Sequence, residues 1–278
     1  NPPYGERIAA AGVAGQRAAT RARETAQFAE GGENTDFFAQ LATHWKKHYA
    51  GWSAWLLTPD LKLPSQMRLK ESKILVVGAG GLGCGALPFL AAAGVGSITI
   101  LDADVIDLSN LARQVLYKTD DVGASKAFKA AEALQALNPT IAIKGIAENL
   151  TADNASSYIA HHDLIIDCTD NFKTRYLIND TCVALEKPFV YGAIHAWEGQ
   201  FALFHPAGPS YRSLFPVEPS SQEIPACDEV GVLGVLPGII GLLQAKEAIF
   251  YLAGFESPAQ KGLMTFDLRD MRLSSFRL

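Results

Sequence analysis

Cysteine is scarce and irregularly spaced in this sequence. The 278 residues contain four cysteines, Cys84, Cys168, Cys182 and Cys227, and none of them form the C-x-x-C spacing typical of zinc sites and redox motifs. Neither a zinc site nor a disulfide framework is indicated, and a reducing, cytoplasmic compartment is expected. The first residues also lack the charged and apolar regions of a signal peptide.

Excess positive charge and long apolar runs are missing as well. The chain carries 24 Lys and Arg against 29 Asp and Glu, a formal net charge of −5, so no basic surface for nucleic acid is implied. The apolar stretch Val230–Ala245 is interrupted by Pro237 and is shorter than the ~20 residues that span a membrane. We expect a buried helix there and no membrane partner. With 49% hydrophobic residues and no low-complexity tract, the chain reads as a folded globular protein.

Strands and helices alternate from Lys73 onward. Apolar runs at 74–77, 97–101, 141–146, 164–167 and 189–192 predict strands separated by helices, an order typical of a parallel sheet with helices on both faces. The runs at 200–204, 263–268 and 272–276 are interpreted as antiparallel strands added to the edge. The expected fold class is α/β, with a doubly wound, mostly parallel sheet extended by antiparallel edge strands.

Residues 1–72 have a different character. A cluster of helix-breaking residues at 31–36 precedes a predicted helix at 37–49 and a predicted strand at 52–58. One helix and one strand cannot bury a core by themselves. We therefore predict two parts, an N-terminal helix-plus-strand appendage (1–72) that is not an independent domain and a main domain (73–278). The start at Asn1 rather than Met suggests a fragmentary or hybrid reading frame.

A glycine loop follows the first predicted strand directly. The sequence Gly78–Gly83 has the form G-x-G-x-x-G and opens a helix, so its backbone N–H groups are placed to bind phosphate at the helix N-terminus. Asp102 and Asp104 end the second strand, 19 and 21 residues after Gly83, where a carboxylate accepts hydrogen bonds from ribose hydroxyls. Taken alone, this pattern is found in nucleotide-binding proteins of many kinds, of which a dehydrogenase is the first expectation. The alternative is that the glycines serve only close packing.

Two cations and two amides come after these acids. Asn110, Arg113 and Gln114 are close together in the sequence, and Lys126 begins the next helix. These charged and amide side chains exceed what is needed to hold a pyrophosphate. They suit a site where a phosphate is attacked at phosphorus and its negative charge must be stabilised. The alternative is that Arg113 and Lys126 form surface ion pairs with Asp120, Asp121 or Glu132.

An acid also follows the strand at 164–167. Asp170, with Asn171 beside it, lies at the carboxyl edge of the sheet, where ligands bind in open α/β folds, and is placed to hold Mg²⁺ on nucleotide phosphates. Alternatively, Asp170 is only the N-cap of the next helix. Cys227 precedes the apolar helix, whose N-terminus would lower its pKa, whereas the adjacent acids would raise it. Both a nucleophilic and a structural role stay open.

Together these motifs resemble the ThiF/MoeB/HesA family, bacterial relatives of ubiquitin-activating enzymes. The matching blocks in residues 73–278 are Gly78–Gly83, Leu101–Asp104, Ser109–Gln114, Val122–Lys126, Asp167–Asn171, Glu198–Gln200 and Gly231–Gly234. The resemblance implies a Rossmann-like domain and adenylation of the C-terminal Gly-Gly carboxylate of a ubiquitin-like sulfur-carrier protein (ThiS/MoaD-like). Pyrophosphate is the leaving group, and the pathway would be thiamin or molybdopterin biosynthesis.

The resemblance also assigns residues. It implies an ATP·Mg²⁺ site formed by Gly78, Gly80, Gly81, Gly83, Asp102, Asp104, Asn110, Arg113, Gln114, Lys126, Asp170 and Asn171. Asp170 would hold the metal, and Arg113 and Lys126 would offset the charge that grows on the phosphates. Adenylation needs no protein nucleophile, but in some relatives a cysteine at the place of Cys227 receives the activated carrier. A homodimer is expected from the family.

The sequence departs from the family at two places. Many relatives bind a structural zinc through two C-x-x-C pairs, and Ser210-Tyr211-Arg212-Ser213 replaces the first pair, so no zinc is predicted. Residues 1–72 lack the Arg-Tyr-x-Arg segment that reaches the partner's ATP. Instead Asn1–Tyr4 and 51–60 resemble the C-terminal tail of RlmL-type rRNA guanine-N2 methyltransferases, whose S-adenosylmethionine loop is absent.

Three alternatives to the adenylation enzyme therefore stay open. The first is an impaired relative that binds nucleotide without activity. The second is a methyltransferase remnant fused to a Rossmann domain. The third acts on tRNA, and it is disfavoured because residues 73–278 carry 15 Lys and Arg against 22 Asp and Glu.

Overall fold

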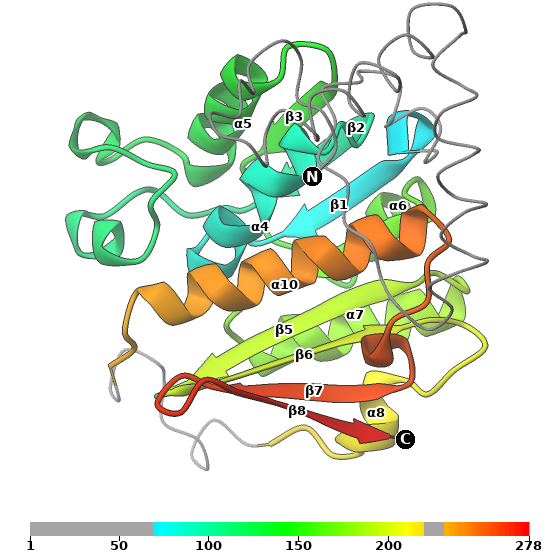
Figure 1. Ribbon diagram of the computed structural model, residues 1–278. Helices are drawn as coiled ribbons and strands as arrows, with labels where there is room; N and C mark the ends of the chain where they lie inside the picture. The colour runs from blue at the N-terminus through cyan, green and yellow to red at the C-terminus, as the bar shows by residue number, and fades with distance from the viewer. Residues whose placement is uncertain (1–68, 220–230, 278) are drawn as a thin grey trace, which may run out of the picture. The chain divides into compact units, whose positions relative to one another are not determined.

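A mixed sheet organises the protein in the computed structural model, which describes residues 69–219 and 231–277. The chain divides into two units, Asn1–Pro59 and Asp60–Leu278, and every described residue belongs to the second. In this unit eight strands follow the order β3-β2-β1-β4-β5-β6-β7-β8. Figure 1 shows α10 on one side of the sheet and α7 on the other.

The strands agree closely with the predicted ones. The first five are mutually parallel: β1 (Lys73–Val77), β2 (Ser97–Leu101), β3 (Ala142–Ile146), β4 (Leu164–Asp167) and β5 (Phe189–His195). The last three are antiparallel and extend one edge: β6 (Glu198–Phe204), β7 (Gly262–Asp267) and β8 (Arg272–Arg277). The predicted α/β class, with its parallel core and antiparallel extension, is confirmed.

The helices include several short ones that the sequence did not predict. The α-helices are α4 (Gly81–Ala92), α5 (Lys126–Leu137), α6 (Ala155–Ala160), α7 (Phe172–Ala184), α8 (Tyr211–Leu214) and α10 (Val235–Leu252). The 3₁₀ helices are η1 (Leu69–Glu71), η2 (Leu108–Ala112), η3 (Thr119–Asp121) and η4 (Pro258–Gln260). Helices of three to six residues carry no helical periodicity, so only the longer helices were predictable.

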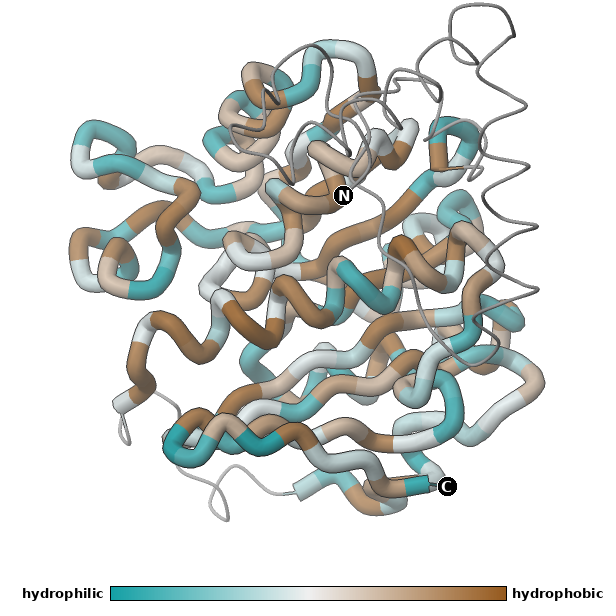
Figure 2. The backbone as a smooth tube through the Cα atoms, in the orientation of Figure 1, coloured by the Kyte–Doolittle hydropathy of each residue, from teal (hydrophilic) through white to brown (hydrophobic). Residues whose placement is uncertain are grey.

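The sheet has two buried faces because successive side chains of a strand point to opposite sides. In β1, Ile74 and Val76 pack with α4, α5 and α10, which we call the α4–α10 face. Leu75 and Val77 pack with α6, α7 and α8, which we call the α7–α8 face. Burial on both faces explains the nearly continuous apolar colouring of β1 in Figure 2.

Helix α10 begins and ends later than the apolar run suggested. Pro237 lies in its first turn, where a backbone N–H has no helical partner, so proline costs no hydrogen bond there. By length and composition alone the helix is long enough to cross a membrane. However, it packs on α4 and on strands β4–β6, with Leu236, Ile240 and Ala248 fully buried. The prediction of a buried helix is confirmed.

Other predictions lie outside the described residues. These are the helix at 37–49, the strand at 52–58 and Cys227.

Candidate nucleotide site

The glycine turn connects β1 to α4 at the carboxyl edge of the sheet. Gly78 has a φ of +98°, and its N–H donates to the carbonyl of Leu101 at the end of β2 (2.9 Å). A Cβ atom at Gly78 would lie 2.6 Å from the carbonyl oxygen of Cys168, and one at Gly83 would lie 2.3 Å from the carbonyl oxygen of Gly78. Both positions therefore require glycine because of the backbone itself.

The first turn of α4 is open to an anion. Gly80 is the N-cap and contributes no side-chain hydrogen bond, and no acidic residue lies in the first turn. The first N–H groups of a helix have no intrahelical acceptor, and the helix dipole favours negative charge there. A helix N-terminus of this kind suits the phosphate-binding role predicted for Gly78–Gly83, which stays a prediction.

Asp102 joins the end of β2 to the glycine turn. Its Oδ2 accepts from the Ala79 N–H at 2.7 Å, and its Oδ1 accepts from the Asp104 N–H at 2.8 Å. Burial raises the pKa of this carboxyl, and the two N–H donors oppose that rise. A carboxylate oxygen has two lone pairs, so each oxygen of Asp102 can still accept a hydrogen bond from a ribose hydroxyl.

Lys126 is the buried cation of the site. The residue is only 6% exposed, and its Nζ lies 2.8 Å from Oδ2 of Asp104. Asp121 and Glu132, which the surface-pair alternative assigned to Arg113 or Lys126, instead contact Lys129. Asp104 therefore orients this lysine, and two further N–H donors of the ammonium group remain for other acceptors.

Tyr117 connects the lysine helix to the glycine turn. Its hydroxyl donates to the carbonyl of Ala79 at 2.7 Å and lies 3.3 Å from the carbonyl oxygen of Lys126. This buried contact fixes the start of α5 against the turn.

Gln114 carries an unsatisfied buried acceptor beside the glycine turn. The residue is 3% exposed, and its Oε1 has no hydrogen-bond partner in the described part of the chain. Its Nε2 lies 3.7 Å from the place of a Cβ on Gly80. Buried polar atoms are normally paired, so this amide suits a ligand group with a donor.

Asn110 and Arg113 lie on the η2 segment next to Gln114. Asn110 Oδ1 accepts from the Asp107 N–H at 3.4 Å, which closes a capping box. The carbonyl oxygen of Arg113 lies 3.6 Å from the place of a Cβ on Gly81. The segment thus lies against the turn, as the resemblance implied.

Asp170 and Asn171 divide two roles after β4. Asn171, not Asp170, is the N-cap of α7, because its Oδ1 accepts from the Thr174 N–H at 2.9 Å. Asp170 is exposed, and among the described residues its carboxylate takes part in no hydrogen bond or ion pair given by the structure. A hard carboxylate oxygen presented to solvent near the glycine turn is the kind of ligand that Mg²⁺ prefers.

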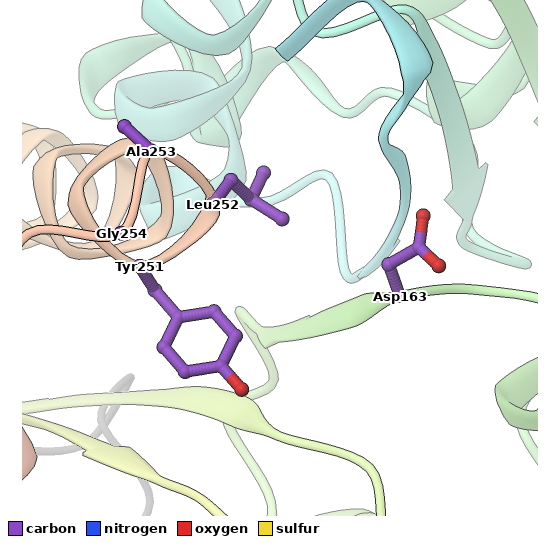
Figure 3. A pocket seen from close by; sticks show the side chains of 5 residues that line it. All are labelled: Asp163, Tyr251, Leu252, Ala253 and Gly254. Atoms are coloured by element: carbon purple, nitrogen blue, oxygen red, sulfur yellow. The ribbon is translucent and has the colours of Figure 1, made fainter. Parts of the chain in front are cut away.

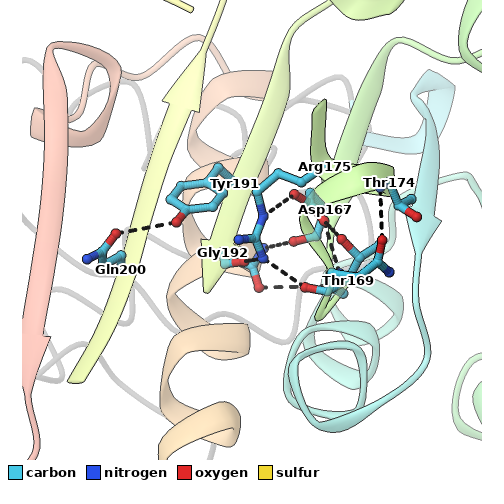
Figure 4. Close-up of polar contacts among 10 residues, drawn as sticks. Asp167, Thr169, Thr174, Arg175, Tyr191, Gly192 and Gln200 are labelled. Atoms are coloured by element: carbon cyan, nitrogen blue, oxygen red, sulfur yellow. Dashed lines mark hydrogen bonds and ion pairs between the residues drawn. The ribbon is translucent and has the colours of Figure 1, made fainter. Parts of the chain in front are cut away.

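A buried ion pair that the sequence analysis missed supports the loop carrying Asp170. Arg175 on α7 donates through Nε to Asp167 (3.3 Å) and through Nη2 to the Thr169 carbonyl (3.0 Å) and the Gly192 carbonyl (3.4 Å). Asp167 also accepts from the N–H and hydroxyl of Thr169 at 3.0 and 2.6 Å. Figure 4 shows Arg175 between Asp167, Thr169 and Gly192.

Burial and charge act in opposite directions on Asp167. Its complete burial raises the pKa, and the Arg175 guanidinium and the Thr169 donors oppose that rise. From the other face of the sheet, Gln244 on α10 donates to the Asp167 carbonyl at 2.6 Å. The sequence carried only a weak signal, because Arg175 lies three residues from both Phe172 and Ile178 and so shares a helix face with apolar side chains. A charge on such a face needs a partner when it is buried.

The described cysteines are packing residues. Cys84, Cys168 and Cys182 are free and buried, and burial raises the pKa of Cys84 to about 12. Their burial is typical of free cysteines that pack as small apolar residues. Cys227 is not among the described residues, so the structure does not place this candidate relative to the others.

A shallow hollow lies at the opposite edge of the sheet. It has a volume of about 520 Å³ and is lined by Asp163, before β4, and by the end of α10 at Tyr251–Gly254. Figure 3 shows Asp163 across the hollow from Tyr251 and Leu252. Because Asp163 precedes β4 and Asp170 follows it, the hollow is separate from the candidate nucleotide site.

Comparison with known proteins places these features in a family context. The sequence model of the ThiF family matches residues 53–278. The sulfur carrier protein adenylyltransferase of Thermus thermophilus is 44% identical over 80% of this chain and 83% of its own length. A probable molybdopterin-synthase adenylyltransferase of Porphyra purpurea is 42% identical over 87% of this chain and 64% of its own length.

Longer relatives and solved structures complete the comparison. MOCS3 of Xenopus laevis, an adenylyltransferase and sulfurtransferase, is 41% identical, and the chain spans only 51% of its length. The structure of E. coli MccB with ATP superposes with a TM-score of 0.68 at 22% identity, covering 76% of this chain and 65% of MccB. PaaA superposes with a TM-score of 0.66 at 18% identity, covering 98% and 91%. At these identities the two structures support the fold.

Proposed function

The chain belongs to the ThiF family, and from this premise we propose that it is an ATP-dependent adenylyltransferase acting on a ubiquitin-like sulfur-carrier protein. The carrying observation is the 44% identity to a sulfur carrier protein adenylyltransferase across four fifths of the chain. The substrate carboxylate is the C-terminal Gly-Gly of the carrier, and the product is an acyl-adenylate for sulfur transfer in thiamin or molybdopterin biosynthesis.

Each residue of the proposed site has a role in the reaction. An oxygen of the carrier carboxylate bonds to the α-phosphorus of ATP, the bond from that phosphorus to the bridging oxygen breaks, and pyrophosphate leaves. The N–H groups at Gly78–Gly83 bind phosphate oxygens, and Asp102 binds the ribose hydroxyls. Lys126 and Arg113 offset the charge that grows on the phosphates, with Lys126 oriented by Asp104.

Further side chains complete the proposed nucleotide site. Asn110 and Gln114 hold the nucleotide from the η2 segment, and Asn171 fixes the helix behind Asp170. Asp170 holds Mg²⁺, which when bound neutralises part of the phosphate charge and favours departure of pyrophosphate.

Pyrophosphate exchange tests the proposal. Labelled pyrophosphate should enter ATP when the full chain is mixed with Mg·ATP and the right member of a panel of Gly-Gly-terminated carriers. Asp170→Asn should lower the exchange rate roughly 10²–10³-fold. The control is Asp163→Asn at the opposite edge, whose amide oxygen can still accept from the Lys73 N–H. Equal exchange in both variants would overturn the role of Asp170, and bound ATP without exchange would identify an impaired relative.

Cys227 receives the activated carrier in a second proposed step. Its thiolate attacks the acyl-adenylate carbonyl, a thioester forms, and AMP leaves. Mass spectrometry under non-reducing conditions should show a carrier adduct with ATP present and none in Cys227→Ala. Exchange itself should be unchanged by that substitution, since it reports only adenylation.

The remaining assignments concern assembly and the N-terminal part. We propose a cytoplasmic homodimer, which light scattering of the purified chain would test. We also propose that residues 1–72 form a methyltransferase-tail-like segment that precedes the adenylation domain at 73–278 in the sequence. S-adenosylmethionine should leave the melting temperature unchanged, because the glycine loop at 78–83 is assigned to ATP.

A further inference from the structure

Ser210 and Ser213 occupy the place where many relatives carry their first zinc-binding pair. The Ser210 N–H donates to the Ser213 hydroxyl at 3.1 Å, and the two hydroxyl oxygens lie 3.3 Å apart, which closes a capping box at the start of α8. Serine hydroxyls are poor zinc ligands. In addition, no group of three or more His, Cys, Asp or Glu among the described residues could hold a metal ion. The described residues at this place therefore do not fit zinc.

Three polar side chains on α7 contact this segment instead. Tyr176, Asn179 and Asp180 have the i, i+3, i+4 spacing that puts side chains on one face of a helix. We call them the α7 clamp. They contact residues 211–217, the stretch that begins with α8 and leads toward Cys227.

Asn179 and Tyr176 bind the backbone of that stretch. Asn179 Oδ1 accepts from the buried Tyr211 N–H at 2.9 Å. The Tyr176 hydroxyl lies 2.9 Å from the carbonyl oxygens of both Phe215 and Val217, so it can donate to either one. These contacts satisfy backbone groups at the start of α8 and just after its end.

Asp180 binds the side chain of Arg212. The guanidinium donates through Nε at 2.6 Å and through Nη2 at 2.8 Å, which is a bidentate pair. The same guanidinium lies 4.6 Å from the centroid of the Tyr176 ring. The donated hydrogen bonds also lower the pKa of Asp180, so the carboxylate stays charged at neutral pH.

Aromatic packing adds an apolar anchor beneath these polar contacts. The Tyr211 ring is buried, with its centroid 5.1 Å from those of Tyr176 and Tyr191 and 4.9 Å from that of Phe215. Thus α7, β5 and the segment itself all contribute to one ring cluster.

We propose that the α7 clamp anchors residues 210–217 without a metal ion and so fixes the chain entering the stretch that carries Cys227. The anchoring is a property of this chain's own side chains and does not depend on the proposed adenylation.

Metal analysis is the first test. The purified full chain should contain well under 0.1 zinc per chain by elemental analysis, and 1,10-phenanthroline should leave its melting temperature unchanged. About one zinc per chain, with a lower melting temperature after chelation, would overturn the proposal.

Limited proteolysis at one peptide bond is the second test. Trypsin must bind an arginine side chain, and the Arg212 guanidinium is held by Asp180. Asp180→Asn should therefore raise the rate of cleavage after Arg212 about two- to fivefold, because the pair is partly exposed to solvent. Tyr176→Phe should raise it less, because it keeps the bidentate pair. The matched control is Glu256→Gln, which removes an exposed 2.7 Å ion pair with Lys261 elsewhere.

The two tests separate this proposal from the proposed function. Equal cleavage rates after Arg212 in Asp180→Asn, Glu256→Gln and the unaltered chain would overturn the clamp. Neither readout uses ATP or a carrier. The clamp proposal can therefore be overturned while pyrophosphate exchange is observed, and the clamp proposal can be supported while exchange is not observed.

Discussion

The two faces of the sheet are packed by different means. On the α4–α10 face, backbones approach closely: a Cβ at Gly241 would lie 2.2 Å from the Leu82 carbonyl oxygen, and one at Gly85 would lie 2.7 Å from that of Gly238. On the α7–α8 face, rings and polar groups fill the space, with Tyr176 and Tyr211 edge to face at 5.1 Å and Arg175 buried beside Asp167.

The difference shows how each face supports the proposed nucleotide site. The α4–α10 face depends on shape, since small residues let helices touch through their backbones and place the N-terminus of α4. On the α7–α8 face, the buried charges and hydroxyls need hydrogen-bond partners. The contacts they make hold the loop before α7 in place. Substitutions should therefore act through steric overlap on the first face and through unpaired polar groups on the second.

The largest effect is expected from Arg175→Met on the α7–α8 face. It leaves the buried Asp167 carboxylate without its partner, which costs about 3–5 kcal/mol in proteins. Urea unfolding monitored by circular dichroism measures this loss. The double variant Arg175→Met/Asp167→Asn should recover part of the stability, because the uncompensated charge is gone. A double variant as unstable as the sum of both single changes would contradict a charge effect.

Steric overlap on the α4–α10 face should follow in size. Gly241→Ala places a methyl group against a backbone carbonyl that cannot rotate away, so a loss of about 2–3 kcal/mol is expected. Gly238→Ala in the same helix is the control, because its Cβ meets nothing within 4 Å. Alanine there should be neutral or stabilising by up to about 1 kcal/mol, since glycine is a poor helix former. Equal destabilisation by both changes would argue against close backbone packing.

Removal of the Tyr176 hydroxyl tests the polar packing of the α7–α8 face. Tyr176→Phe keeps the ring but leaves the Phe215 and Val217 carbonyls without this donor, which should cost about 1 kcal/mol in thermal or urea unfolding. Tyr158→Phe is the control, because the Tyr158 hydroxyl contacts only the exposed Glu148. An effect of the control as large as that of Tyr176→Phe would show that the hydrogen bonds to these two carbonyls are not the cause.

The smallest effect concerns a buried histidine on the α7–α8 face. His162 Nδ1 lies 2.6 Å from the Tyr158 carbonyl and must donate to it, so Nε2 accepts from the Thr99 hydroxyl at 2.8 Å. Burial lowers the pKa of His162 below its ordinary value of 6.5. Above that value His162 is neutral in both the folded and the unfolded chain, so this residue makes no contribution to the pH dependence of stability. As the pH falls below 6.5, the unfolded chain takes up the proton first and stability is lost.

A substitution isolates this contribution. The difference in free energy of unfolding between the original chain and His162→Gln should shrink from pH 7.5 to pH 5.5. Urea titrations at the two values give that difference. A constant difference would exclude protonation of His162 as a source of pH dependence.

Much of the sheet was predictable because its strands carry a strong local signal. β1, β2 and β4 are short apolar runs ended by glycine or aspartate, so their predicted bounds differ from the observed ones by at most one residue. The glycine turn, Asp102 and Lys126 were also predicted, because parallel strands bring their carboxyl ends to one edge. The short helices, such as α6 and α8, were not predicted.

The unpredicted part of the site depends on long-range pairing. Gln244 meets the Asp167 carbonyl across 77 positions of sequence, and no spacing rule indicates that contact. The sequence also could not predict that Lys126 pairs with Asp104 rather than with a nearer acid. This ion pair depends on the packing of α5 against β3 and β2. Such contacts follow from the tertiary arrangement alone.

The strand order has a consequence for folding kinetics. β1 lies between β2 and β4, and it meets β2 with a separation of 24 residues (Lys73 with Ser97), whereas the Lys73–Asp163 contact beside β4 spans 90. Loop-closure entropy grows with the logarithm of loop length, so the longer closure costs about 1 kcal/mol more. The glycine turn ends β1 and Asp170 follows β4. The two halves of the proposed nucleotide site are therefore brought together by the entropically more expensive of the two pairings, and the folding rate should be set by non-local contacts.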